Sequence, residues 1–212
     1  MSTLVVDLDG RIAKSPRFKK GSIAEYFRKS DLRWWRAISQ KGSYREQNKI
    51  ITTWLSKCCA KKVLELGPGF GRITSLIRTS HPDELTLIEV NELALQFLNK
   101  KFPNAHLISA DVSRHDLGAE SYDLIVVVEV FVHIPDIETL LRKIHSALKD
   151  CGSAIVSITP LSWYKENTKG QATIHRGIER SEFEEFVEPL FAIQAIHQST
   201  TGQHLSYLLQ KR

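Results

Sequence analysis

The sequence has no long apolar run and no secretory leader pattern, and these absences argue against membrane-spanning and exported proteins. The longest apolar runs, at 124–128 and 154–158, are far shorter than the roughly 20 residues that cross a bilayer. The amino terminus lacks the basic segment, apolar stretch and small-residue cleavage site of a signal peptide. We therefore expect no membrane span and a cytoplasmic location.

Cysteine is also scarce, with three residues in the chain. Cys58 and Cys59 are adjacent and Cys151 is distant, so the set has neither the spacing of a zinc site nor the even count of a disulfide framework. We expect no metal site, and a reducing compartment is the simplest setting for such thiols.

The overall composition is that of a globular protein, with 42% hydrophobic and 25% charged residues among 212, enough for one compact domain with a short appendage. The charge is uneven along the chain. Residues 1–62 hold 15 Lys and Arg against 5 Asp and Glu, whereas residues 63–212 hold 14 against 19. The basic segment either meets phosphates or an acidic partner or forms a solvated helix surface, and we favour the second interpretation.

From residue 62 onward, short β-branched runs alternate with segments of helical periodicity. This alternation predicts an α/β fold with a seven-stranded, mostly parallel sheet and helices on both faces. A short loop joins the last two strands after a single helix, so we expect an antiparallel last strand. The predicted strands span 62–66, 85–89, 105–109, 122–128, 153–158, 192–197 and 204–210, and the predicted helices span 71–80, 92–102, 136–149 and 181–189.

Upstream, apolar residues at helical spacing predict two further helices at 31–40 and 44–57. We expect them to form a helical cap. The predicted organisation is a basic amino-terminal arm at 1–21, the cap at 22–60 and a core domain at 61–212. A polar stretch at 163–180 is predicted to be a loop over the pocket.

A glycine-rich turn joins the first predicted strand of the core to its helix, with the sequence Glu65-Leu-Gly-Pro-Gly-Phe-Gly71. Glycine has no Cβ, so the main chain can turn tightly and a small ligand can lie against it and against the unpaired N–H groups of the helix start. The spacing Gly-x-Gly-x-Gly differs from the dinucleotide fingerprint, and Arg72-Ile73 stands where a Walker loop has Lys and Ser or Thr. Neither phosphate motif fits.

Two carboxylates follow the next two predicted strands. Glu89 ends the second strand, where a carboxylate can accept both hydroxyls of a ribose. Asp111 follows the third strand and precedes Val112, a pair that suits the exocyclic amine and the face of an adenine. A strand-end acid alone is common, but these features in order on successive strands form a much stronger signal.

With these motifs in register, the sequence resembles the class I S-adenosylmethionine-dependent methyltransferases, of the small-molecule, methyltransferase domain 11 type. The resemblance rests on the glycine turn, Glu89, Asp111-Val112 and the segment 122–136, and covers about residues 62–160. It implies a Rossmann-like fold, S-adenosylmethionine as cofactor and methyl transfer to an oxygen or nitrogen atom. The cofactor contacts that it implies are Glu65, Gly67, Pro68, Gly69, Gly71, Glu89, Val90, Asp111, Val112 and Glu129.

Methyl transfer requires an acceptor that is held in line and can lose its proton. His133 follows the fourth predicted strand, where the resemblance places the methyl group, and imidazole accepts protons near neutral pH. We predict that His133 is the base, and a structural role in the turn before Pro135 stays open. A small-molecule acceptor is expected, and the predicted walls of its site are Trp35, Tyr44, Trp163 and Tyr164.

Four other functions stay open. His133 and Gly71-Arg-Ile-Thr74 also resemble the protein N-terminal amine methyltransferases, although Glu179 is the one conceivable match for their second catalytic carboxylate. The basic segment allows an RNA methyltransferase or a nucleic-acid-binding module without catalysis, whose binding would weaken steeply with salt. Val5-Val-Asp-Leu-Asp-Gly10 resembles the start of a haloacid dehalogenase-type phosphatase, but Arg11 replaces the usual Thr.

Overall fold

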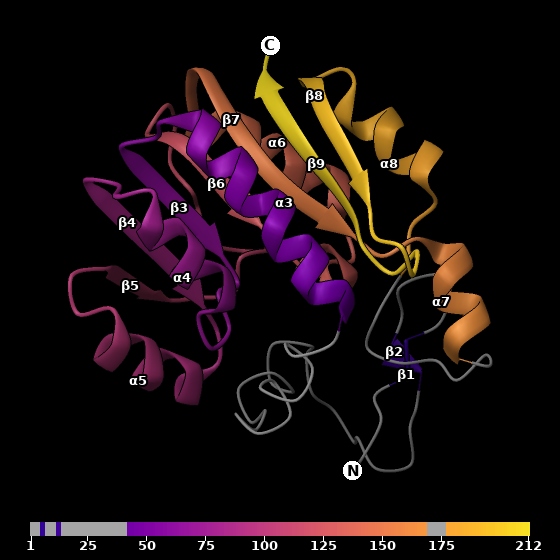
Figure 1. Ribbon diagram of the computed structural model, residues 1–212, viewed down its shortest axis with the longest axis horizontal. Coiled ribbons are helices and arrows are strands. Elements are labelled where there is room, and N and C mark those ends of the chain that lie inside the picture. Colours follow the sequence, from indigo (N-terminus) through magenta and orange to yellow (C-terminus); the bar gives the residue numbers. More distant parts are fainter. Residues whose placement is uncertain (1–4, 7–11, 14–41, 169–176) are drawn as a thin grey trace.

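The computed structural model describes residues 5–6, 12–13, 42–168 and 177–212. Its main feature is a seven-stranded sheet with the strand order β5-β4-β3-β6-β7-β9-β8 (Figure 1). The strands are β3 (Lys62–Leu66), β4 (Glu84–Glu89), β5 (His106–Ser109), β6 (Tyr122–Val127), β7 (Leu148–Ile158), β8 (Phe191–Gln198) and β9 (Leu205–Lys211).

Strands β3 to β7 pair in parallel with one another, whereas β9 is antiparallel to both β7 and β8. These pairings confirm the predicted Rossmann-like, mostly parallel sheet and its antiparallel last strand. A separate antiparallel pair, β1 (Val5–Val6) and β2 (Ile12–Ala13), lies within the predicted amino-terminal arm. In the described part of the chain, no helix is long and apolar enough to cross a membrane.

Helices cover both faces of the sheet (Figure 1). One hydrophobic cluster joins the sheet to α3, α4 and α5, and a second joins the opposite face to α6 and α8. Because successive side chains of a strand point to opposite faces, Val63 belongs to the first cluster and Leu64 to the second. The helices are α3 (Gly42–Cys58), α4 (Arg72–Thr79), α5 (Glu92–Lys101), α6 (Ile137–Ala147), α7 (Leu161–Thr168) and α8 (Arg180–Val187), with a 3-10 turn η1 (Phe131–His133).

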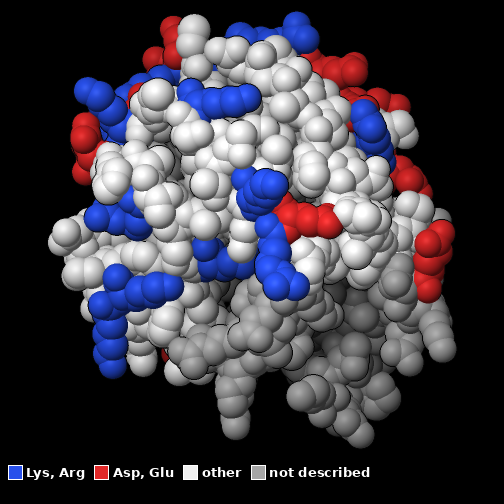
Figure 2. Space-filling model, in the orientation of Figure 1, with Lys and Arg blue, Asp and Glu red and all other residues white. Residues whose placement is uncertain are grey.

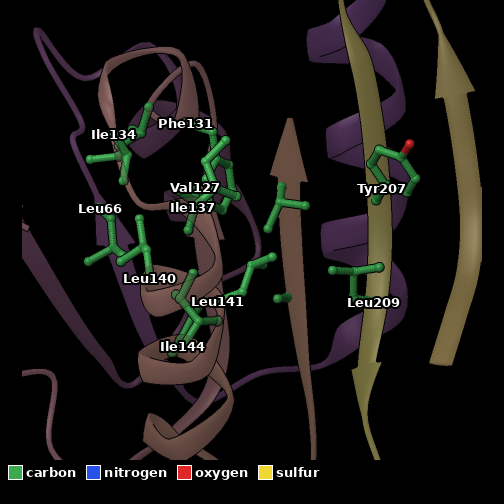
Figure 3. Packing of buried hydrophobic residues seen from close by; sticks show 14 of the residues in the cluster. Leu66, Val127, Phe131, Ile134, Ile137, Leu140, Leu141, Ile144, Tyr207 and Leu209 are labelled. Atoms are coloured by element: carbon green, nitrogen blue, oxygen red, sulfur yellow. The ribbon is translucent and has the colours of Figure 1, made fainter. Parts of the chain in front are cut away.

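Helix α6 shows how the second cluster is built (Figure 3). Its apolar residues recur at helical spacing and point at the sheet, while Asp136 accepts the backbone N–H of Thr139 at 3.0 Å and caps the helix as expected. This packing covers one face of the sheet. The labelled residues of this cluster are Leu66, Val127, Phe131, Ile134, Ile137, Leu140, Leu141, Ile144, Tyr207 and Leu209.

Two predicted boundaries are wrong. Helix α6 ends at Ala147 rather than at 149, because Leu148 pairs with Tyr122 and begins strand β7. The predicted loop at 163–180 is helical at its start, since α7 follows Pro160 and contains neither Gly nor Pro. Of the two predicted cap helices, the second corresponds to α3, and the first, at 31–40, lies outside the described residues. The boundaries at residues 21 and 60 stay predictions.

Candidate active site

The site lies where the strand order of the sheet reverses. Strand β3 is central, and the chain continues from it to β4 and β5 on one side before β6 and β7 return on the other. In such sheets the loops at the carboxyl ends of the two central strands diverge and leave a crevice for a ligand. Here the glycine turn follows β3, and Glu129 follows β6.

The three glycines of the turn serve different purposes. All have positive φ, between 54° and 78°, a region that other residues rarely adopt. A Cβ on Gly67 would lie 2.7 Å from Val130, and a Cβ on Gly71 would lie 2.6 Å from Phe102, so both positions are closed by packing. At Gly69 nothing lies within 4 Å of an added Cβ. Gly69 therefore borders open space, as expected of a cradle for a ligand, and Pro68 beside it is buried.

Glu89 connects the turn to strand β4. Its Oε2 accepts the N–H of Gly69 at 2.8 Å, and its Oε1 accepts the N–H groups of Val90 and Asn91 at 2.7 and 2.8 Å. The side chain is 6% exposed, and burial raises its pKa despite these hydrogen bonds. The sequence predicted Glu89 as a ribose contact, which stays a prediction, but missed this architectural role. Oε2 accepts a single hydrogen bond and retains capacity for a hydroxyl donor.

Asp111 follows β5 at the same edge. Its Oδ1 accepts the N–H and the hydroxyl of Ser113 at 2.9 and 2.7 Å. Its Oδ2 has no hydrogen-bond partner in the described part of the chain. The neighbouring Val112 is 9% exposed and packs mainly into the second hydrophobic cluster. The free oxygen of Asp111 suits an amine donor, and its contact with adenine stays a prediction.

Glu65, in strand β3 just before the glycine turn, holds the turn to helix α4. It is 3% exposed, and Thr74 of α4 donates a hydrogen bond of 2.6 Å to its Oε2. Burial raises the pKa of Glu65 to about 8, so the group is mostly protonated at neutral pH. A neutral carboxylic acid here fastens α4 to β3 without placing a charge under the turn.

Beyond β6, Glu129 is the centre of a buried polar group. Its Oε1 accepts from Gln47 at 3.0 Å and from Ser157 at 3.1 Å, and His204 Nδ1 lies 2.9 Å from the same oxygen. Burial alone would raise the pKa of this carboxyl, but His204, Gln47 and Arg72 outweigh it and lower the pKa to about 2. We call these residues the Glu129 cluster; its members are Tyr44, Gln47, Arg72, Glu129, Ser157 and His204.

The backbone of Glu129 is unusual as well. Its φ is 62°, in the left-handed region, and its N–H donates to Ser157 Oγ at 2.9 Å. Non-glycine residues held in this region cost on the order of 1 kcal/mol or more and persist where the surroundings impose them. The carboxylate is thus ionised and held in place, and in the described part of the chain its Oε2 has no hydrogen-bond partner.

Helix α3 is tied to the glycine turn through Arg72, the first residue of α4. The guanidinium donates to Gln47 Oε1 at 2.8 Å and to Asn48 Oδ1, and it lies 4.9 Å from the centre of the Tyr44 ring. Burial, reinforced by the charge of Glu129, raises the pKa of Tyr44. The amino-terminal half of α3 therefore closes one side of the site.

The residues predicted to handle the acceptor are only partly brought together. Tyr44 lies in the Glu129 cluster. Trp163 is half-buried beside the loop between β8 and β9, where its Cδ1 would be 3.6 Å from a Cβ on Gly202. His133 is half-buried on η1 and its N–H donates to Val130 at 2.8 Å. Trp35 and the side chain of Tyr164 lie outside the described residues, so their roles stay predictions.

Sequence reasoning missed Gln47, Ser157 and His204. Their positions are 82, 28 and 75 residues from Glu129, and no local motif joins them. Among them, only Ser157 gave a local signal, as a polar residue within the apolar run of β7. Among the described residues, no group of three or more His, Cys, Asp or Glu side chains could hold a metal ion.

Comparison with known proteins agrees with this geometry. Residues 64–156 match a family described as a methyltransferase domain. An uncharacterized methyltransferase-like protein of Schizosaccharomyces pombe is 36% identical over 90 residues, 42% of this chain and 35% of that protein. N-methyltransferase 4 of Papaver somniferum is 34% identical over 95 residues, 42% of this chain and 27% of its own. The chain thus spans less than half the length of these two curated relatives.

Solved structures extend the likeness to most of the chain. N-methyltransferase NodS from Bradyrhizobium japonicum, in complex with S-adenosyl-L-homocysteine, superposes with a TM-score of 0.70 at 18% identity, over 89% of this chain and 96% of that one. Magnesium protoporphyrin IX methyltransferase from Synechocystis has the same score at 15% identity. These structures show that the fold is that of an α/β methyltransferase domain over most of the chain. Residues 64–156 match the methyltransferase domain family itself.

Proposed function

We propose that this protein binds S-adenosylmethionine at the carboxyl edge of its sheet and transfers the methyl group to an oxygen or nitrogen atom of a small molecule. The observation that carries the proposal is the arrangement of Gly69, Glu89 and Asp111 on three successive strand ends, with open space at Gly69 and a free oxygen on Asp111. Each offers a group that matches a different part of the cofactor.

The residues fit the cofactor in the following way. Gly67 and Gly69 would carry the methionine part, Glu89 the ribose hydroxyls, and Asp111 the adenine amine. When bound, S-adenosylmethionine supplies an electrophilic methyl carbon on a sulfonium, whose carbon–sulfur bond breaks as the acceptor forms its bond. The chain itself has to hold the acceptor in line, exclude water and take the acceptor's proton.

A small-molecule acceptor is supported by the relatives. They include N-methyltransferase 4 of Papaver somniferum and (S)-coclaurine N-methyltransferase of Thalictrum flavum, which is 31% identical over 88 residues. The packing of α3 beside the glycine turn also supports it, because the contacts of Arg72 with Gln47 and Tyr44 narrow the site on this side.

Methylation of RNA is the second candidate. Ribosomal RNA small subunit methyltransferase A of Hydrogenobaculum is 37% identical over 57 residues, 27% of this chain. Lys and Arg side chains also stand out on the face shown in Figure 2. Helix α3, which crosses this face in Figure 1, carries the exposed residues Arg45, Lys49 and Lys57. We favour the small molecule because these cations are solvated and spread along the helix.

Calorimetric titration with S-adenosylmethionine and S-adenosylhomocysteine tests cofactor binding. The variant Gly69→Ala should weaken it at least tenfold, because the methyl group enters the open space beside the turn. Gly118→Ala is the matched control, since Gly118 also has positive φ, at 77°, and lies away from the site. Both variants carry a similar backbone strain, so loss of binding in Gly69→Ala alone identifies the cradle. No heat with wild-type protein at millimolar cofactor would refute the proposal.

The acceptor is tested with cofactor carrying a labelled methyl group. Metabolite, peptide and RNA pools are incubated separately with the wild-type protein. Label transferred to small molecules supports the proposal. Label confined to RNA, with transfer falling steeply as salt rises, would replace it by the second candidate, and label confined to peptide amino termini would favour the N-terminal amine methyltransferases.

A further inference from the structure

The Glu129 cluster contains a group that cofactor binding does not require. His204, just before strand β9, is 0% exposed, and its Nδ1 lies 2.9 Å from Glu129 Oε1. Its second ring nitrogen, Nε2, is buried and has no hydrogen-bond partner in the described part of the chain. Buried polar atoms are normally paired, so an unpaired ring nitrogen beside a proposed site calls for a ligand.

The position of the ring proton follows from its partner. Glu129 Oε1 accepts hydrogen bonds from the Gln47 amide and the Ser157 hydroxyl, as an ionised carboxylate does, and a carboxylate only accepts hydrogen bonds. The hydrogen shared with Glu129 therefore belongs to Nδ1. In the neutral ring this leaves the lone pair on Nε2, which is the arrangement that a buried carboxylate imposes on a histidine that accepts protons.

The ring is also held rigidly. The N–H of His204 donates to Ser199 Oγ at 3.0 Å, and the Tyr44 ring packs against the imidazole with 4.5 Å between ring centres. The loop that carries His204 is fastened to α3, since Glu46 accepts the N–H of Thr200 at 2.8 Å. A further hydrogen bond of 3.0 Å joins Ser43 to Gln203.

We infer that His204, positioned by Glu129, accepts the proton of the methyl acceptor. This inference rests on the proposed function. As the acceptor's electron pair forms its bond to the methyl carbon, the proton moves from the acceptor oxygen or nitrogen to Nε2, and the electron pair of the broken carbon–sulfur bond stays on sulfur. The resulting imidazolium is stabilised by the Glu129 carboxylate and later loses its proton to water.

This assignment differs from the sequence prediction, which gave the role to His133. The two histidines come from different elements, η1 and the loop before β9. A ring nitrogen of His204 lies 2.9 Å from Glu129, whose carboxylate is linked through Gln47 to Arg72 beside the glycine turn. Glu129 acts through His204 and is a positioning residue.

The first test reads the ring directly and needs no acceptor. Two-bond proton–nitrogen spectra of the full chain, labelled with nitrogen-15 in histidine, are recorded at pH 7.5 with and without S-adenosylhomocysteine, and His204→Asn assigns the signal. We expect the neutral form with the hydrogen on Nδ1. In Glu129→Gln the preference for this form should fall. An imidazolium, or a hydrogen on Nε2, in the wild-type protein would overturn the inference.

The second test uses the acceptor found by the labelled-methyl screen. In His204→Asn the amide nitrogen of Asn replaces Nδ1 and keeps the hydrogen bond to Glu129, while the Nε2 position is lost. We expect methyl transfer to fall by about 10² to 10⁴, with the dissociation constant of S-adenosylhomocysteine changed less than about threefold. His145→Gln on α6 is the matched control and should keep its activity.

The outcomes separate the inference from the proposed function. Wild-type protein that binds no S-adenosylhomocysteine refutes the function, whatever the state of the ring. Wild-type protein that methylates while His204→Asn keeps full turnover refutes the inference alone, and a large loss confined to His133→Gln would return the role to His133. A folded His204→Asn with a normal melting temperature and normal cofactor binding excludes a merely structural effect.

Discussion

Acidic residues lie at or near both ends of strands β4 and β6, and the acids at the amino ends are bonded differently from those at the carboxyl ends. At the amino edge, Glu84 pairs with Lys62 at 3.1 Å with 65% of its side chain exposed, and Asp123 binds Lys149 at 2.7 Å. At the carboxyl edge, Glu89 and Glu129 are largely buried and bonded to groups of the site.

Asp123 of β6 and Glu129 just after it also differ in which oxygens are used. Asp123 engages both, since Oδ1 takes Lys149 and Oδ2 takes the N–H groups of Lys61 and Lys62. The Glu129 carboxylate accepts hydrogen bonds on Oε1, and its Oε2 has no partner in the described part of the chain. Asp123 is thus satisfied on both oxygens near water, whereas Glu129 is largely buried, oriented and left with capacity to spare. Four predictions probe the difference between the two ends of the strands, from the largest expected effect to the smallest.

The pH dependence of stability should report Glu65, the most buried acid near the carboxyl edge. Its folded pKa of about 8 lies above the ordinary 4.5, so its contribution is fully present below pH 4.5 and is lost as the pH rises to 8. At about 1.4 kcal/mol per pKa unit the loss approaches about 5 kcal/mol. Urea unfolding from pH 5 to 8 should show this decline in wild-type protein and a flatter profile in Glu65→Gln. Parallel profiles would contradict it.

Replacing Glu129 by Ala should lower the free energy of unfolding by about 3 to 5 kcal/mol at pH 7, because Gln47, Ser157 and His204 lose a shared buried acceptor. The wild-type contribution is present above pH 4.5 and disappears as the pH falls to about 2. Denaturant unfolding measures both. Asp123→Ala, at the amino end of β6, is the control and should lower the free energy of unfolding by about 1 kcal/mol. Equal losses in the two variants would contradict the difference between the two ends.

Glu89→Gln should weaken binding of S-adenosylhomocysteine at least tenfold and lower the free energy of unfolding by about 1 to 3 kcal/mol. The amide keeps one acceptor, but its NH₂ group faces a backbone N–H that the carboxylate accepted, either at Gly69 or at Val90 and Asn91. Titration calorimetry and urea unfolding separate the two effects. Unchanged affinity would show that Glu89 is architectural alone.

Glu84→Gln, at the other end of β4, should change the free energy of unfolding by about 0.5 kcal/mol or less and leave cofactor affinity unchanged. Its ion pair with Lys62 is exposed on both sides, at 37% and 65%, so solvent and salt screen it. The same two measurements apply. A change in cofactor affinity in this variant would contradict the expectation that the amino ends of the strands do not affect the site.

Much of the fold could be predicted because its signals are local. The β-branched runs and the apolar spacing of α6 follow from periodicity, and Asp136 was recognisable as a cap. The predicted boundaries of helices and strands were wrong where a residue pairs with another that is distant in the sequence. Leu148 extends β7 because Tyr122 pairs with it across the sheet, and a chain-local pattern does not contain that pairing.

The site divides in the same way. Gly69, Glu89 and Asp111 were predicted because each follows a strand, and parallel strands bring their carboxyl ends to one edge. The sequence by itself therefore determined the fold class and predicted which end of the strands holds the cofactor. Only the tertiary structure decided that, of the three glycines in the turn, it is Gly69 that borders open space, and that His204 meets Glu129. Those facts depend on packing between residues far apart in the chain, which no spacing rule records.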